Sequence, residues 1–241
     1  MKKIFITCLL ILVVNIGFSQ KSFRLGLNFA PSFAWLKPDV KNSVGKDIYT
    51  TKGTGTKIGF SYGLAGEFAF GDNYSFSTGL FLTTNGGGLE YLDSISVIKD
   101  SSLHSVTTIR KHNLQYVEIP LTLKLKTNEI GYITYYGKFG VGTAFLVKAR
   151  ANDVSEDPNI TLVVEDRDIR DKTNFFRASL IIGAGMEYSL GGNTSFIASI
   201  IYNNGFTNVF QKNLKSITIE GEKHKVQAKS AYLALNVGVL F

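Results

Sequence analysis

Large apolar residues alternate with small or polar ones along much of the chain, in segments of about a dozen residues. In the stretch SFRLGLNFAPSF, Leu25, Leu27 and Phe29 alternate with Arg24 and Gly26. A period of two is typical of a β-strand that has one apolar face. The same pattern predicts eight strands, at 22–33, 57–70, 74–84, 113–126, 132–148, 175–190, 194–204 and 227–241.

The breaks between the predicted strands alternate in length. Three are short, at 71–73, 127–131 and 191–193, and four are long, at about 34–56, 85–112, 149–174 and 205–226. Short turns at one end and long loops at the other are typical of an outer-membrane barrel. We therefore expect an all-β fold, an eight-stranded antiparallel up-and-down transmembrane β-barrel, with both termini at the periplasmic, short-turn end.

The two faces of the predicted strands differ in a way that indicates their surroundings. One face carries Leu, Ile, Val and Phe, and the other carries Gly, Ala, Ser, Thr and Asn with a few charges. A soluble lipocalin-like barrel, which is the alternative, places its bulky apolar residues inside. Because eight strands enclose only enough space for side chains, we expect the small and polar residues inside and the bulky ones against lipid. An aromatic girdle is expected near the short turns, from Phe68, Phe70, Tyr74, Tyr132, Tyr135, Tyr188 and Phe241.

Six of the charged residues on the predicted strands fall on the small-residue face. A Lys or Arg on the lipid face costs roughly 2–4 kcal/mol at the midplane of the bilayer, which explains this placement. The three acids and three bases are expected to neutralise one another in a polar network inside the barrel. A gate or a proton path is the functional alternative. The predicted network consists of Glu67, Glu118, Lys124, Lys138, Arg177 and Glu187.

One residue conflicts with its predicted strand. Pro120 lies in the middle of the fourth segment, and a proline removes a hydrogen bond from a strand ladder. We expect a bulge there, or a carbonyl group left to a lumen side chain or a water molecule.

The first residues have the three parts of a secretory signal. Lys2 and Lys3 precede an apolar run at 4–14, and Gly17 and Ser19 supply small residues before a cut. A membrane-spanning helix needs about 20 apolar residues, so the run is too short for one. We expect a signal peptide at 1–19 and a barrel domain at 20–241.

Composition agrees with an exported barrel. The 241 residues are 44% hydrophobic and 19% charged, too apolar for a disordered chain, and 24 Gly with only 4 Pro suit strands and tight turns. The single Cys8 lies inside the signal, which leaves no cysteine for disulfides or metal. Nucleic acid is not an expected partner of an exported barrel, although the net charge is +7.

The candidate residues for chemistry are concentrated in the long loops. His112 with Glu90, or His224 with Glu222, are candidates for a rim enzyme acting on lipid A, but no spacing supports either pair. The third loop mixes acids with arginines, which favours ion pairs over a calcium site. We expect no catalytic, cofactor or metal site. The Lys-rich first and fourth loops could meet lipopolysaccharide phosphates, through Lys37, Lys41, Lys46, Lys52, Lys212, Lys215, Lys223 and Lys225.

The stretch NLQYVEIPLTLKLK at 113–126 carries a resemblance to a known family. Its core YVEIPL, followed by Lys124, resembles the signature of the PorT-like outer-membrane β-barrel family of Bacteroidetes-type bacteria. The opening SFRLGLNFAPSF and the last strand are also similar. The resemblance implies a barrel of the general OmpX/OmpA shape, and the founding member serves type IX secretion and gliding.

The final residue, Phe241, resembles the C-terminal signal that the barrel insertion machinery recognises. Together these features predict a monomeric, non-enzymatic protein of the bacterial outer membrane with a structural or interaction role. Its expected surroundings are outer-membrane lipid and lipopolysaccharide, with secretion-system or cell-envelope proteins as candidate partners. The alternatives are a PorT-type accessory of secretion and a rim enzyme that modifies lipid A.

Overall fold

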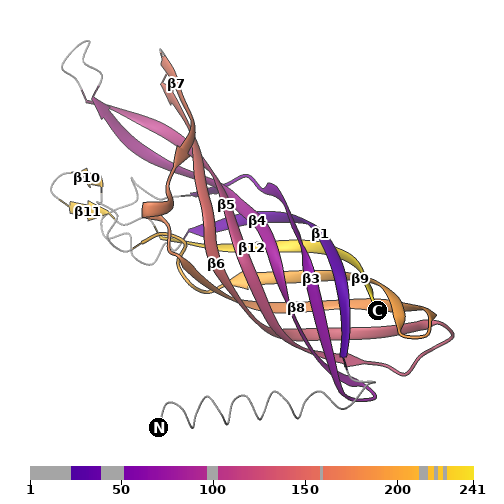
Figure 1. The fold of residues 1–241 in the computed structure, drawn as a ribbon. Helices are drawn as coiled ribbons and strands as arrows, with labels where there is room; N and C mark the ends of the chain where they lie inside the picture. The colour runs from indigo at the N-terminus through magenta and orange to yellow at the C-terminus, as the bar shows by residue number, and fades with distance from the viewer. Residues whose placement is uncertain are drawn as a thin grey trace, which may run out of the picture.

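A computed structural model describes residues 23–38, 52–96, 103–157, 160–211, 217–219, 222–224 and 227–241. It shows a closed antiparallel β-barrel of eight strands (Figure 1), which confirms the predicted fold class. The barrel strands are β1 (Phe23–Pro38), β3 (Lys57–Gly71), β4 (Tyr74–Ser96), β5 (Leu103–Lys126), β6 (Ile133–Asp157), β8 (Phe176–Gly191), β9 (Thr194–Gly205) and β12 (Ala228–Leu240).

Each barrel strand pairs with its neighbours in sequence, and β1 pairs with β12 to close the sheet. At this seam Leu25 and Phe241 exchange two backbone hydrogen bonds, of 3.0 and 2.7 Å. A closed sheet has no edge strand, so its backbone groups can be paired within the sheet where no water is present.

The remaining elements are short. Strand β2 (Lys52–Thr54) pairs with β4, and β7 (Ile160–Asp168) pairs with β6. Strands β10 (Ile217–Ile219) and β11 (Glu222–His224) form a separate hairpin, and η3 (Arg170–Lys172) is a turn of 3₁₀-helix. Within the described residues, no helix is long and apolar enough to cross a membrane.

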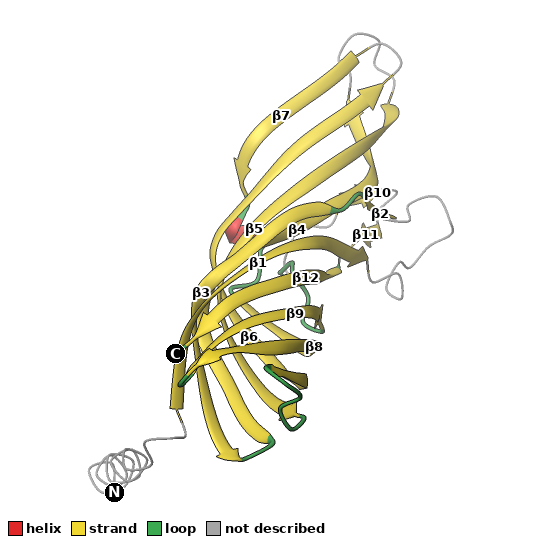
Figure 2. Cartoon of the chain, turned by 90° about the vertical axis from the view of Figure 1, so that its right-hand side faces the viewer, coloured by secondary structure: helices red, strands yellow, loops and turns green. Residues whose placement is uncertain are grey.

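Two of the predicted long loops are largely strand. The β4–β5 ladder continues to Ser96↔Leu103 and the β5–β6 ladder to Thr107↔Glu156, so much of 85–112 and 149–174 is paired. Figures 1 and 2 show these strands and β7 standing beyond one end of the barrel. The glycines at 86–88, taken as a break in the sequence, are part of β4. A Cβ at Gly87 would lie 2.7 Å from the Leu36 backbone nitrogen, so glycine permits β1 to approach closely there.

The bulky faces of the strands point outward, as predicted. The exposed fractions of Leu121, Val141 and Leu235 are 39%, 45% and 54%, whereas those of Glu118 and Arg177 are 4% and 2%. Six of the seven girdle residues are exposed near the short turns, and Phe68 is partly exposed. Two girdle pairs are in contact, with ring centroids 6.2 Å apart in Phe70–Tyr74 and in Tyr132–Tyr188.

The small and polar residues point inward as expected, but they do not fill the interior alone. Phe81 and Ile181 line the interior, and larger apolar side chains such as Leu36, Leu89 and Leu114 are buried further along the barrel. The interior must be packed without large voids, and small residues alone cannot fill it.

Of the two outcomes expected at Pro120, the bulge is absent. The β4–β5 ladder has no paired partners at Ile119 and Pro120 but keeps the same register on both sides. A register shift occurs instead between β5 and β6 at Gln115/Tyr116, where Val147 is the extra residue. The proline therefore interrupts one ladder locally and does not shift it.

Candidate functional site: the barrel interior

The end of the barrel with the short turns holds a group of buried and half-buried charges, here called the turn-end ion cluster: Arg24, Glu67, Lys124, Lys126 and Glu187. Arg24 donates hydrogen bonds of 2.8 Å to both Glu67 and Glu187. Lys124 lies 2.7 Å from Glu67 and also contacts Glu187. Lys126 contacts Glu67 and lies 3.2 Å from Glu187. Each acid therefore meets three bases.

Strand register explains why these five residues converge. Arg24 and Glu67 are direct cross-strand partners, and Lys124 and Lys126 lie two apart on the inner face of β5. The Lys124 ammonium also lies 4.0 Å from the ring centre of Tyr136, which stabilises a cation. Unpaired buried charges cost several kcal/mol each, so the pairing determines whether this arrangement is tolerated.

A second group, here called the mid-barrel cluster, consists of Glu118, Arg177, Asn203 and Tyr232. The Glu118 carboxylate accepts hydrogen bonds from the Asn203 amide at 2.9 Å and from the Tyr232 hydroxyl at 3.1 Å. Arg177 lies 3.7 Å from Glu118 and donates a 2.6 Å hydrogen bond to Asn203. All four side chains are buried.

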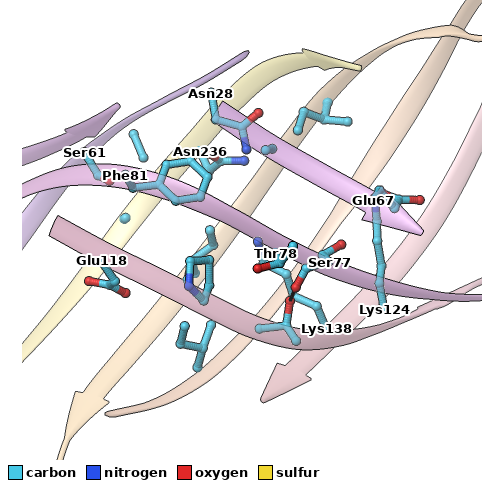
Figure 3. Close-up of a pocket in the computed structure, with 18 of the residues that line it drawn as sticks. Asn28, Ser61, Glu67, Ser77, Thr78, Phe81, Glu118, Lys124, Lys138 and Asn236 are labelled. Atoms are coloured by element: carbon cyan, nitrogen blue, oxygen red, sulfur yellow. Dashed lines mark hydrogen bonds and ion pairs between the residues drawn. The ribbon is translucent and has the colours of Figure 1, made fainter. Parts of the chain in front are cut away.

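A cavity of about 90 Å³ separates the two clusters (Figure 3). Glu67 and Lys124 line it on one side and Glu118 on the other, and Lys138 also lines its wall. Such a volume holds several water molecules. The six residues named from the sequence thus lie in two clusters and one cavity wall, and they do not form a single network.

Sequence reasoning missed four members of these clusters. Arg24 and Lys126 stand on the same inward faces as the charges that were named, so the alternation alone would have identified them. Asn203 and Tyr232 also point inward, but neutral side chains give no comparable signal.

The other half of the interior, toward the extended strands, is filled by a buried apolar cluster. This loop-end apolar cluster contains Leu36, Leu89, Leu114, Tyr116, Ala144, Ala149, Ala151, Ile169, Val209, Phe210 and Ala228. Part of it comes from two segments that connect strands: Ile169 lies between β7 and β8, and Val209 and Phe210 follow β9. Ile169 donates to the Ala149 carbonyl at 3.1 Å and Val209 to the Ala228 carbonyl at 2.8 Å, which anchors both segments to the barrel wall.

His112, a candidate for rim catalysis, belongs to this apolar surrounding. Its ring lies 5.1 Å from that of Phe210, and its Nδ1 atom is buried without a partner. The pKa of His112 is lowered to about 4, first by burial and then by the nearby Arg110. Glu90 lies opposite Ile109 on the outer face of β4, so His112 and Glu90 do not form a pair. The side chains of His104, His224 and Glu222 lie outside the described part.

Three of the acids in the third loop form ion pairs. Arg170 lies 3.1 Å from Asp168, Arg167 lies 3.6 Å from Asp153, and Arg150 contacts Asp166. Over the described ranges, no three His, Cys, Asp or Glu side chains are grouped as a metal site would require. The side chains of Glu156 and Asp157 lie outside these ranges.

Fold and interior together define an outer-membrane β-barrel, with apolar outer walls and a polar filling. The chain belongs to the family described as outer membrane protein beta-barrel domain, whose sequence model matches residues 18–211. It is therefore a protein of the bacterial outer membrane, surrounded by lipid and lipopolysaccharide.

Solved structures with the same type of fold are remote in sequence. Ail, the attachment invasion locus protein of Yersinia pestis, is 14% identical with a TM-score of 0.37, over 91% of this chain and 99% of that one. Neisserial surface protein A is 12% identical with a TM-score of 0.40, over 91% and 97%. OprG from Pseudomonas aeruginosa is 10% identical with a TM-score of 0.46, over 91% and 96%. A comparison with curated proteins finds no match.

Proposed function

We propose that the protein is a monomeric, non-enzymatic barrel that holds an interaction surface outside the membrane, on the cell-surface side. Both termini and the short turns then face the periplasm. The observation that carries this proposal is the continuation of β4, β5, β6 and β7 beyond the apolar outer wall (Figure 2).

The outer face of β5 shows where the wall ends. Leu125, Leu121 and Val117 point outward and are followed by Gln115, Asn113 and Lys111, while the ladder continues to Leu103. At about 3.3 Å per residue, the nine residues from Lys111 to Leu103 span roughly 26 Å, and all of them lie beyond the apolar segment that ends at Val117. A hydrogen-bonded sheet of this length presents a more rigid surface than a loop, which favours binding of another macromolecule.

In the proposed orientation, Lys37 on the outer wall lies near the outer leaflet of the membrane. Lys37 is exposed beside Trp35 and donates hydrogen bonds to the Tyr202 hydroxyl at 2.9 Å and to Asn204 Oδ1 at 3.1 Å. Aromatic residues with a nearby lysine are typical of the membrane–water boundary. Lipopolysaccharide phosphates lie at that boundary in the outer leaflet, so they are the expected contact of Lys37. Lys52 is also exposed, and the side chains of the other lysines expected in these loops lie outside the described part.

Orientation is tested with a protease site inserted in whole cells. A site placed between β4 and β5, at 98–101, should be cut in intact cells. The matched site in the turn at Asp72–Asn73 should be cut only after permeabilisation. The reverse pattern would overturn the orientation.

The interaction role is tested by shortening the extension. A variant in which a tight turn replaces 91–108 keeps the eight barrel strands, so heat-modifiable gel migration should be unchanged. Cross-linking in cells should yield specific adducts with the full chain that the shortened variant lacks. The same adducts in both proteins would contradict the proposal.

A more specific role, as a PorT-type accessory of type IX secretion, is supported by the stretch YVEIPL at 116–121. A deletion strain that secretes and glides normally would exclude it. The lipid A enzyme has no support in the geometry around His112, and an unchanged lipid A mass profile in the deletion strain would exclude it as well. The signal peptide at 1–19 lies outside the described residues, and recognition of Phe241 by the insertion machinery stays a prediction.

A further inference from the structure

Among the described residues, Lys138 differs from the other charged side chains of the two clusters because no partner is found for it. In the part of the chain that the structure describes, no hydrogen bond or ion pair joins its ammonium to another group. Its direct cross-strand neighbour is Lys124, which points into the same interior. Like charges that face each other across a strand pair are destabilising, so this pair requires compensation.

The surrounding carboxylates do not supply that compensation. Glu67 and Glu187 already form ion pairs with Lys124, and they also contact Arg24 and Lys126. The two clusters and Lys138 together contain five bases and three acids, which leaves two positive charges in excess. One excess charge belongs to the turn-end ion cluster and is shared among its bases. The other is the Lys138 ammonium, which stands in the cavity wall.

We infer that the cavity between the two clusters binds a small monovalent anion of the size of chloride, with the Lys138 ammonium as its main ligand. The wall offers further neutral polar groups, from Ser77 and Asn236 (Figure 3). A volume of about 90 Å³ admits a chloride ion with some of its hydration water.

Charge and size restrict the anion. Glu67 and Glu118 lie on opposite sides of the cavity, so a divalent anion would meet two carboxylates for one free ammonium. Large organic anions exceed the volume. The site requires no open channel, and it does not depend on which end of the barrel faces the cell surface.

The test measures the thermal stability of the purified full-length barrel in detergent, at constant ionic strength. Sodium chloride is exchanged for sodium gluconate, whose anion is too large for the cavity. We expect the melting temperature to rise saturably with chloride, by about 2–4 °C, because a ligand of the folded state stabilises it. Bromide should act like chloride and sulfate should not.

Lys138→Gln should remove this chloride response, and the matched surface variant Lys52→Gln should keep it. Equal responses in Lys138→Gln and the wild type would overturn the inference, as would a wild type that does not distinguish chloride from gluconate. If Lys138→Gln does not fold, Lys138→Arg is the second variant, and it should retain the response with an altered chloride midpoint. Chloride NMR line broadening by the wild type, reversed by bromide, provides the direct binding measurement, and its absence would also overturn the inference.

Discussion

The two halves of the barrel interior are filled by different chemistry on the same strands. In the turn half, the inner face of β5 carries Lys124 and Glu118, and the outer face carries Leu121. In the loop half, the same inner face carries Leu114, and the outer face carries Asn113. The polarity of β5 thus reverses near Gln115 and Val117, although the strand itself continues.

This reversal shows where the solvent changes. In hydrocarbon, a barrel exposes apolar side chains and must place its polar groups inside. Beyond the hydrocarbon the wall meets water, and burial of apolar side chains becomes the favourable arrangement, as in a soluble protein. The loop half is therefore a conventional hydrophobic core stacked on a membrane barrel, and each half should respond to mutation according to its own chemistry.

The largest expected effect is in the turn half. Glu67→Gln leaves three bases with Glu187 alone, and breaking a buried ion pair costs about 3–5 kcal/mol. Urea unfolding of the refolded barrel in detergent measures this free energy. Glu165→Gln, an exposed control, should change it by less than about 0.5 kcal/mol. A cost below about 1 kcal/mol for Glu67→Gln would mean that water solvates the cluster.

In the loop half, the corresponding test removes an apolar side chain. Leu114→Ala opens a cavity in the loop-end apolar cluster and should cost about 3 kcal/mol. It should also speed hydrogen exchange at 206–211, which packs on that cluster. The matched control is Leu64→Ala, which faces outward and should have a much smaller effect. Equal effects of the two variants would contradict a packed core in this half.

A third test locates the boundary on the outer wall. Leu121→Arg places a cation on the apolar outer face of β5 and should reduce the free energy of unfolding in lipid by about 2–4 kcal/mol. Asn113→Arg makes the same addition on the same face beyond the apolar segment and should cost at most about 1 kcal/mol. Similar costs at both positions would show that the hydrocarbon extends further than the polarity reversal indicates.

The smallest expected effect is a pH dependence that belongs to the loop half. Outward Asn113 and Lys111 flank His112, which places it beyond the membrane-spanning part of β5. The folded state holds the pKa of His112 at about 4, below its ordinary value of 6.5, so the unfolded chain binds a proton first as pH falls. His112 therefore destabilises the fold progressively below pH 6.5, by about 2 kcal/mol at pH 5.

The check compares the free energy of unfolding of the wild type and His112→Gln from pH 7.5 to 4.5. The difference between the two proteins should change with pH below 6.5 and stay constant above it. Parallel pH profiles would show that His112 is solvated in the folded state.

Much of this architecture follows from alternation along the chain. Period-two patterns identified all eight barrel strands and the side of each that meets lipid, because bilayer and lumen select opposite residues at neighbouring positions. The same rule ended the fourth predicted strand at residue 113, because beyond that point neither face of β5 is consistently apolar: the inner face carries His112 and Arg110, and the outer face carries Lys111 and Ile109. A rule that assumes one solvent on each side of the sheet cannot follow a strand that passes from lipid into water.

The sequence by itself determined the strands, their faces and the class of membrane in which the barrel is placed, because these depend on local periodicity. Only the tertiary structure decided which inward charges meet: Arg24, Lys124 and Glu187 come from three strands, and the register and closure of the sheet set their distances. Closure of the sheet also placed Lys138 opposite Lys124, where no carboxylate among the described residues pairs with it. It brought Val209 and Phe210 into the loop-end apolar cluster. Such partnerships depend on contacts between distant segments, and a one-dimensional pattern of residue types contains no distances between strands.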